Sequence, residues 1–228
     1  MQSLSKVYAM IEVLAAVTVL SLSCVPPAYS QDYESREIGW QASGGYSAPG
    51  GTTSNYLDGG WIFSGGAIFR PEPGSPLSLL AELHYSGYGA THQAIALANS
   101  AAPDVRIDDG DAYVFGVNFD GMYYVPFFPR VHAYLLGGIG WDHRRVRLTQ
   151  TVLIGGIYCD PWWGYCYEGV LPGQAIVADE TTTRFAWNAG FGLEFPVSRG
   201  AVFVEARYHQ METATPTTFI PIQVGYRY

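Results

Sequence analysis

The sequence predicts an all-β protein, a single eight-stranded antiparallel up-and-down transmembrane β-barrel with short periplasmic turns and long outer loops. Eight segments alternate with period two between an aromatic or aliphatic face and a face of Gly, Ala and single charges. The connections between these segments alternate long and short. Charged residues make up 14% of the chain, about half the usual share of a soluble domain. Such continuous apolar faces are tolerated on the outside of a barrel only in lipid.

The N-terminus is typical of an export signal. Lys6 supplies a positive charge, residues 13–22 form a short apolar core, and residues 28–30 read Ala-Tyr-Ser, a small-x-small cleavage pattern. The core is about half of the roughly 20 residues that an anchoring helix needs. We therefore expect a cleaved signal peptide at residues 1–30 and a barrel at residues 31–228. The barrel region has no run of about 18 apolar residues, which excludes a helical membrane protein.

The first four strands are predicted from alternation, and Gly-, Pro- and Ser-rich segments separate them. Their inward positions carry mostly small residues, together with Glu82 and His84 in the third strand and Asn118 and Asp120 in the fourth. The predicted strands and their outward residues are 37–46 with Ile38, Trp40, Ala42 and Tyr46; 61–70 with Trp61, Phe63, Ala67 and Phe69; 77–88 with Leu79, Ala81, Leu83 and Tyr85; and 111–124 with Tyr113, Phe115, Val117, Phe119 and Tyr123.

The last four strands show the same alternation, and their aromatic residues near the strand ends predict two interfacial girdles. They are 131–142 with Ala133, Leu135, Ile139 and Trp141 outward; 183–195 with Phe185, Trp187, Ala189, Phe191, Leu193 and Phe195; 201–209 with Val202, Val204, Ala206 and Tyr208; and 219–228 with Ile220, Ile222, Val224, Tyr226 and Tyr228. The final strand is expected to close the barrel against the first.

The connections give the barrel a direction. The long ones are 47–60, a flexible loop, then 89–110, 143–182 and 210–218, whereas 71–76, 125–130 and 196–200 are short turns. Because periplasmic turns are short, an even strand number puts both ends in the periplasm. Residues 149–158 have strand character, so the fifth and sixth strands are expected to extend above the membrane as a hairpin.

Cys159 and Cys166 remain once Cys24 leaves with the signal peptide. The residues between them are rich in turn formers, and an exported protein folds where disulfides persist. We therefore predict a disulfide that staples the third outer loop. A metal site would need further ligands nearby, and none has the required spacing. No metal and no cofactor are predicted.

The lumen of an eight-stranded barrel is filled by side chains. Inward charged residues predict an ion network that Asn118 and Asp120 extend, because buried charges are costly unless they are paired. The network is either structural or part of a gated narrow conductance, and the sequence leaves both open. Its predicted members are Glu82, Arg184, Glu194, Glu205 and Arg207.

Catalysis is not predicted. A lipid-modifying site would need a Ser, a His and a carboxylate together at the rim. His209 points inward with no serine nearby, and the inward set Glu82, His84 and Ser86 is what alternation alone produces. The remaining histidines, His92, His132 and His143, are scattered.

The outer loops are the predicted place of function. The tip of the third loop is a candidate binding patch, unless its aromatic residues pack on other loops or rest on lipid headgroups. The acidic residues of the second loop, Asp104, Asp108, Asp109 and Asp111, attract cations or are simply solvated. The patch consists of Tyr158, Trp162, Trp163, Tyr165 and Tyr167.

The sequence resembles the eight-stranded outer-membrane barrels of the OmpA-like and Ail/OmpX-like kind. The resemblance rests on Leu-Ala-Glu-Leu-His-Tyr at 80–85, Val-Glu-Ala-Arg-Tyr at 204–208, the Gly-rich 134–141 and the C-terminal 224–228. It implies that Tyr226 and Tyr228 form the signal read by the barrel-assembly machinery, although the family usually ends in Phe. It also implies contact with outer-membrane lipid and lipopolysaccharide.

These observations predict an outer-membrane protein with a structural or surface-recognition, adhesin-like role. A narrow channel for small solutes is the second interpretation, and a lipid-A-modifying enzyme is the third. The formal charge of −8 argues against a nucleic-acid partner, which would require a basic surface.

Overall fold

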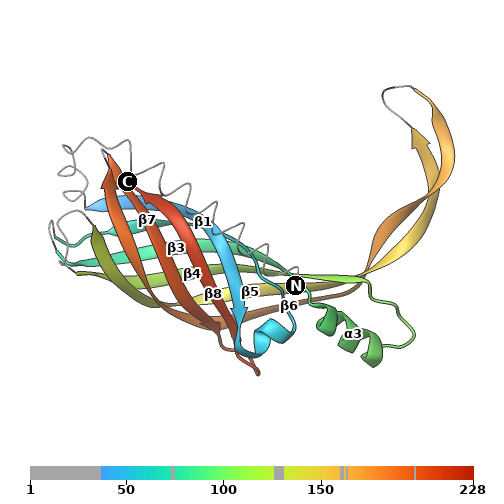
Figure 1. Ribbon diagram of the computed structural model, residues 1–228, viewed down its shortest axis with the longest axis horizontal. Coiled ribbons are helices and arrows are strands. Elements are labelled where there is room, and N and C mark those ends of the chain that lie inside the picture. The colour runs from blue at the N-terminus through green and yellow to red at the C-terminus, as the bar shows by residue number, and fades with distance from the viewer. Residues whose placement is uncertain (1–36, 73–74, 126–130, 160–161, 163, 198) are drawn as a thin grey trace.

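The chain forms a closed antiparallel barrel of eight strands in sequence order, with the last strand paired to the first (Figure 1). The computed structural model describes residues 37–72, 75–125, 131–159, 162, 164–197 and 199–228. The predicted signal peptide, residues 1–30, lies outside these ranges. Barrel closure was predicted from the final strand, and it is confirmed by the register of β8 on β1, which runs from Gln41 opposite Arg227 to Gly50 opposite Thr218.

All eight predicted strands are present, and most are longer than alternation alone indicated. The extensions occur mainly at the outer ends, where antiparallel pairing continues beyond the apolar pattern. The strands are β1 (Ile38–Gly50), β2 (Gly60–Phe69), β3 (Leu77–Gly89), β4 (Asp109–Val125), β5 (His132–Cys159), β6 (Cys166–Val197), β7 (Gly200–Met211) and β8 (Thr217–Arg227).

Two outer loops differ from expectation. The loop expected at 47–60 begins as part of β1 and then forms the short helix η1 (Gly51–Asn55), so it is more ordered than its Gly and Ser content indicated. The loop 89–110 contains the helix α3 (His92–Ala101), which we did not predict. Thr91 caps this helix, because its side-chain oxygen accepts a hydrogen bond from the Ala94 N–H. Among the described residues, no helix has both the length and the apolarity required to cross a membrane.

The outer wall of the barrel carries exposed apolar side chains, as predicted. Aromatic rings gather near both of its ends. Trp61 and Tyr85 lie 5.3 Å apart at the outer end, and Trp40 and Tyr228 lie 5.7 Å apart at the other. The exposed apolar residues between these ends include Phe63, Leu79, Leu83, Phe115, Phe119, Leu135, Ile139, Phe191 and Ile222.

The lumen is filled in layers, which can be followed along the inward residues of β3. Leu80 lies in an apolar cluster with Ile68, Met122, Tyr134 and Leu136 at the end of the short turns. Glu82 lies in a layer of charged residues, and His84 lies in the next layer. Tyr88 belongs to a second apolar cluster, with Ala112, Val114 and Phe219, near the outer loops.

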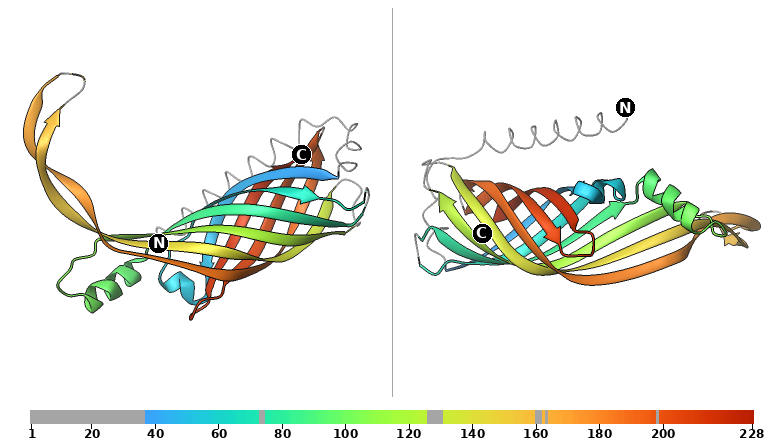
Figure 2. Two further views of the ribbon diagram at one scale, coloured as in Figure 1. Left: turned by 180° about the vertical axis from the view of Figure 1, so that it is seen from behind. Right: turned by 90° about the horizontal axis from the view of Figure 1, so that it is seen from below.

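The third outer connection is a long two-stranded hairpin, as predicted. It continues β5 and β6 far beyond the other strands and curves away from the barrel (Figures 1 and 2). The register shifts between Leu148 and Thr149, where the hairpin leaves the barrel. A bulge at this point bends and twists a strand, which is consistent with the curvature.

Candidate functional site

The lumen contains two arginine-centred clusters. In the first, Arg207 of β7 contacts carboxylates of β3 and β4, with its Nη1 2.9 Å from Glu82 Oε1 and 3.1 Å from Asp120 Oδ2. Its Nε also donates to Glu205. Gln41 donates to Glu82 at 2.7 Å, and Asn188 donates to Asp120 at 2.8 Å. These carboxylates are therefore both charge-paired and hydrogen-bonded.

The second cluster surrounds Arg227, which is fully buried. Arg227 donates to Glu194 Oε2 at 2.6 Å and to the Tyr134 hydroxyl at 2.9 Å. Its guanidinium carbon also lies 4.2 Å from the centre of the Phe203 ring. Glu205 contacts both arginines, with 3.5 Å from its Oε2 to Arg227, and so joins the two clusters.

Four of the five residues predicted for the lumen network lie in these clusters, and Arg184 does not. Arg184 is exposed and donates to the Thr183 carbonyl. The prediction that Arg184 belongs to the network is wrong. Alternation gives Arg184 an inward position, but the neighbouring strand β7 ends at Met211, opposite Ala186. No residue of β7 therefore lies beside Arg184 to close the wall. Its role is taken by Arg227, which alternation placed inward but which we did not assign to the network.

A third group of polar side chains lies in the next layer, toward the outer loops. His84 Nε2 is 3.4 Å from Asp142 Oδ1, and His209 Nε2 is 2.6 Å from Asp142 Oδ2. The three residues come from β3, β5 and β7, and all are buried. The sequence did not predict this contact. Its only sign in the sequence is that all three residues occupy inward positions, each on a different strand.

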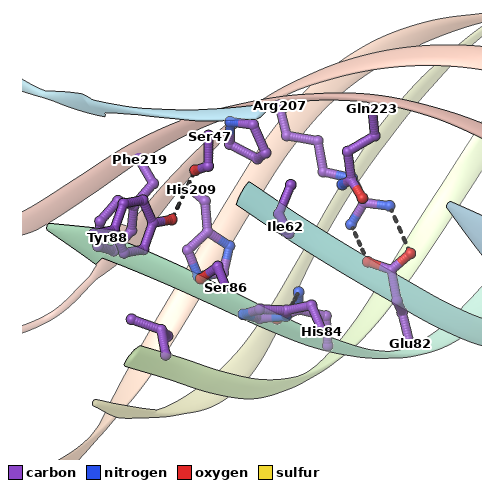
Figure 3. A pocket seen from close by; sticks show the side chains of 13 residues that line it. Ser47, Ile62, Glu82, His84, Ser86, Tyr88, Arg207, His209, Phe219 and Gln223 are labelled. Atoms are coloured by element: carbon purple, nitrogen blue, oxygen red, sulfur yellow. Dashed lines mark hydrogen bonds and ion pairs between the residues drawn. The ribbon is translucent and has the colours of Figure 1, made fainter. Parts of the chain in front are cut away.

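A cavity of about 20 Å³ adjoins this group (Figure 3). Its walls include His84, His209, Ser86 and Arg207. The Tyr88 ring closes one side, and its hydroxyl donates to Ser47 Oγ at 2.7 Å. A cavity needs about 10–15 Å³ to hold one water molecule. This space therefore accepts a water molecule or a single ion rather than a larger solute.

The outer hairpin carries the predicted loop patch. Cys159 and Cys166 form a disulfide at its end, with Tyr158 opposite Tyr167 one position below. Trp162 is 89% exposed and Tyr165 is also exposed. Neither ring is covered by the other outer loops. Trp163 lies outside the described residues.

The hairpin exposes aliphatic side chains along its length. Leu153 is 76% exposed and Ile157 is 70% exposed. Ile154, Val170 and Ile176 are exposed as well. An isolated two-stranded ribbon buries little apolar surface in water, so this hairpin presents an apolar surface that the rest of the barrel leaves open.

The second outer loop contacts the base of this hairpin through backbone hydrogen bonds at Thr149 and through the carboxylate of Asp108. Asp108 accepts a hydrogen bond from the Thr151 N–H at 2.9 Å, and Arg106 Nε donates to it at 2.9 Å. The Thr151 amide, followed by Arg106, lowers the pKa of the Asp108 carboxyl. Asp108, one of the four acidic residues noted in the second loop, therefore makes specific hydrogen bonds within the protein.

Comparison with known proteins concerns the fold. No protein-family model matches the sequence, and no curated protein sequence matches it. The chain is similar to the solved structure of Neisserial surface protein A, with a TM-score of 0.51 and 13% identity over 84% of this chain and 96% of that one. It also matches Ail of Yersinia pestis, solved with the heparin analogue sucrose octasulfate, at a TM-score of 0.43 and 15% identity over 85% and 100%. OprG of Pseudomonas aeruginosa matches at 0.44 and 8% over 86% and 99%.

The similarity to Neisserial surface protein A agrees with the closed barrel of eight strands in sequence order. The described chain therefore has the fold of the eight-stranded outer-membrane β-barrel proteins.

Proposed function

We propose that this protein lies in an outer membrane and uses the β5–β6 hairpin to recognise a surface partner. The exposed apolar ribbon that ends at the disulfide carries the proposal. Large exposed apolar surfaces on folded proteins mark interaction sites, and exposed Trp and Tyr are the residues most often central to binding interfaces.

The position of the hairpin relative to the C-terminus supports an orientation in which the hairpin faces away from the periplasm. The hairpin lies at the opposite end of the barrel from the C-terminus (Figure 1). Outer-membrane barrels turn their short connections toward the periplasm and their long loops outward. In that orientation the hairpin projects from the cell, and Tyr226 and Tyr228 lie at the periplasmic end, as an assembly signal would require.

The chemistry of the hairpin favours an apolar partner surface. Residues 149–178 contain no Lys and no Arg. A sulfated or phosphorylated polymer would need such cations, whereas a protein surface with exposed apolar side chains needs none. We therefore expect the ligand to be a protein.

The lumen supports neither alternative function. The cavity beside His84 and His209 is too small for a solute pathway, and the two arginine clusters hold their carboxylates in a closed network. Among the described residues, no serine hydroxyl is hydrogen-bonded to His84 or His209. A lipid-modifying serine enzyme would need such a pair.

The test compares three forms of the protein on the surface of a non-adherent host bacterium. The first is wild type, the second carries an Asn-Gly turn in place of residues 150–175, and the third carries Leu153→Thr with Ile157→Thr. The deletion joins the strands at Thr149 and Ile176, which are paired in the register, and Asn-Gly suits a two-residue hairpin turn. A control replaces α3 by a Gly-Ser linker of the same length.

Adhesion of the cells to immobilised fibronectin, laminin and collagen is then measured, together with cell-to-cell aggregation. Wild-type cells and the α3 control are expected to adhere or aggregate. The deletion variant is expected to lose this activity, and the double threonine variant is expected to lose most of it. Equal adhesion by the deletion variant, or none by wild type on any surface, would contradict the proposal.

A further inference from the structure

Asp142 is a buried carboxylate without an arginine partner. It is fully buried, and among the described residues its ion-pair partners are two histidines, His84 and His209. The other carboxylates of the lumen layers contact Arg207 or Arg227. A carboxylate removed from water is costly unless a cation compensates it. The lumen therefore lacks a fixed cation at this one position.

The lumen as a whole is also rich in negative charge. Arg207 and Arg227 face four carboxyl groups in their clusters, those of Glu82, Asp120, Glu194 and Glu205, and Asp142 is a fifth nearby. With Arg70, the described residues thus include three buried arginines and five buried carboxylates. In a low-dielectric interior, this excess attracts a cation more strongly than it would in water.

The donor atoms around Asp142 are close enough together to bind one metal ion after small adjustments. One nitrogen from each histidine and one carboxylate oxygen lie within 4.8 Å of one another. A tetrahedral zinc site with bonds of about 2.0–2.1 Å places its ligand atoms about 3.3 Å apart, and His84 Nε2 lies 3.4 Å from Asp142 Oδ1. His209 Nε2 is hydrogen-bonded to Asp142 Oδ2 at 2.6 Å. An ion bound here would take the place of the proton in that hydrogen bond.

Asp142 has an oxygen atom that accepts no hydrogen bond, and a glycine leaves space beside it. Asp142 Oδ1 is buried without a hydrogen-bond partner. Gly116 lies between His84 and Asp142 in the register of β3, β4 and β5. A Cβ on Gly116 would come within 2.2 Å of both Asp142 Oδ1 and His84 Cε1. The glycine therefore allows the two side chains to meet, and the adjoining cavity has room for a water molecule as a fourth ligand.

A hydrogen-bond partner for the Nδ1 atom of His84 is also present. Asn118 Nδ2 lies 3.3 Å from His84 Nδ1, and its Oδ1 is buried without a partner. A histidine that binds metal through Nε2 carries its proton on Nδ1 and donates it to an acceptor. Rotation of the Asn118 amide by 180° turns Oδ1 toward His84 Nδ1, which frees Nε2 for an ion.

We infer that His84, Asp142 and His209 bind a divalent first-row transition metal ion, such as Zn²⁺, within the lumen. Two imidazoles and one carboxylate suit this class of ion better than Ca²⁺ or Mg²⁺. The ion would join β3, β5 and β7 across the lumen, so its role would be to stabilise the barrel. The inference does not depend on the hairpin.

The test refolds the full chain from urea into detergent micelles with equimolar Zn²⁺ and, separately, with Co²⁺. After removal of free metal, the bound metal is measured by mass spectrometry and the cobalt coordination by absorption. Asp142→Asn and His209→Gln remove one donor each and preserve side-chain size. His143→Gln is the matched control, since His143 is the sequence neighbour of Asp142 but is exposed. A heat-modifiable gel shift verifies that each variant has folded.

Wild type and His143→Gln are expected to retain one Zn²⁺ per chain and to show a tetrahedral cobalt spectrum. Asp142→Asn and His209→Gln are expected to bind at least about a hundredfold more weakly, and Asn118→Leu about ten- to a hundredfold more weakly. The inference is overturned if folded wild type retains no metal, or if Asp142→Asn retains as much as wild type.

Discussion

At the scale of single residues, inward parity was not sufficient to assign a side chain to the lumen. Arg184 and Arg207 both alternate inward and both carry a guanidinium group. Arg207 is enclosed by neighbouring strands and contacts three carboxylates, whereas Arg184 lies beyond the end of β7 and is exposed. The same alternation therefore produced one correct assignment and one wrong one, and the lengths of neighbouring strands separate them.

This contrast predicts a large difference between two matched substitutions. Arg207→Met leaves the buried carboxylates of Glu82 and Asp120 without a cation and leaves Glu205 with Arg227 alone. It is therefore expected to lower the free energy of unfolding by about 3–5 kcal/mol. Arg184→Met removes the same charge from an exposed position and is expected to change it by at most about 0.5 kcal/mol. Urea titration in lipid vesicles, followed by tryptophan fluorescence, measures both values. Similar values for the two variants would show that the Arg207 cluster does not stabilise the barrel.

At the scale of elements, the outer loops are more ordered than their composition indicated. We did not predict α3 because the helix is short and has no apolar stripe, although its four alanines favour a helix. The hairpin was identified because β-branched residues at 149–158 continue the pattern of the fifth strand. Asp108, in the loop that follows α3, accepts a hydrogen bond from the Thr151 amide of the hairpin.

The Asp108 contact predicts a pH-dependent signal in the hairpin. Because the folded pKa lies below the ordinary value of 3.8, the contact contributes stability above that value and loses it as the pH falls through the lower folded pKa. The amide proton shift of Thr151, measured by NMR, is expected to titrate with a midpoint below 3.8. Asp108→Asn should abolish this titration. A midpoint at or above 3.8 in wild type would mean that the hydrogen bond is absent.

At the scale of the whole molecule, side chains fill the lumen of the barrel in successive layers. Apolar clusters lie toward both ends, with the arginine clusters and the His84, Asp142 and His209 group between them. The interior of an eight-stranded barrel is only wide enough for such filling.

Refolded protein in planar lipid bilayers is therefore expected to give no discrete conductance steps under conditions in which a sixteen-stranded porin gives large ones. The measurement covers both polarities of voltage and pH values from 5 to 8, so that a gated opening would be detected. Reproducible single-channel steps from the wild-type barrel would contradict the filled lumen and would restore the channel interpretation.

Much of the fold was predictable from the sequence because strand alternation is a local property. The outward face, the number of strands, the closure of β8 on β1, the hairpin and the disulfide pair all follow from residue periods, turn residues and cysteine count. Four of the five lumen residues also followed. The assembly signal at Tyr226 and Tyr228 stays a prediction.

The sequence by itself determined that each strand has an apolar outer face and a small or charged inner one, since neighbouring residues alone set this pattern. Only the tertiary structure decided which inward residues meet, because the stagger of the strands sets their relative height in the lumen. That stagger brought Arg227 to Glu194 and His209 to Asp142. It left Arg184 beyond the end of β7, in solvent.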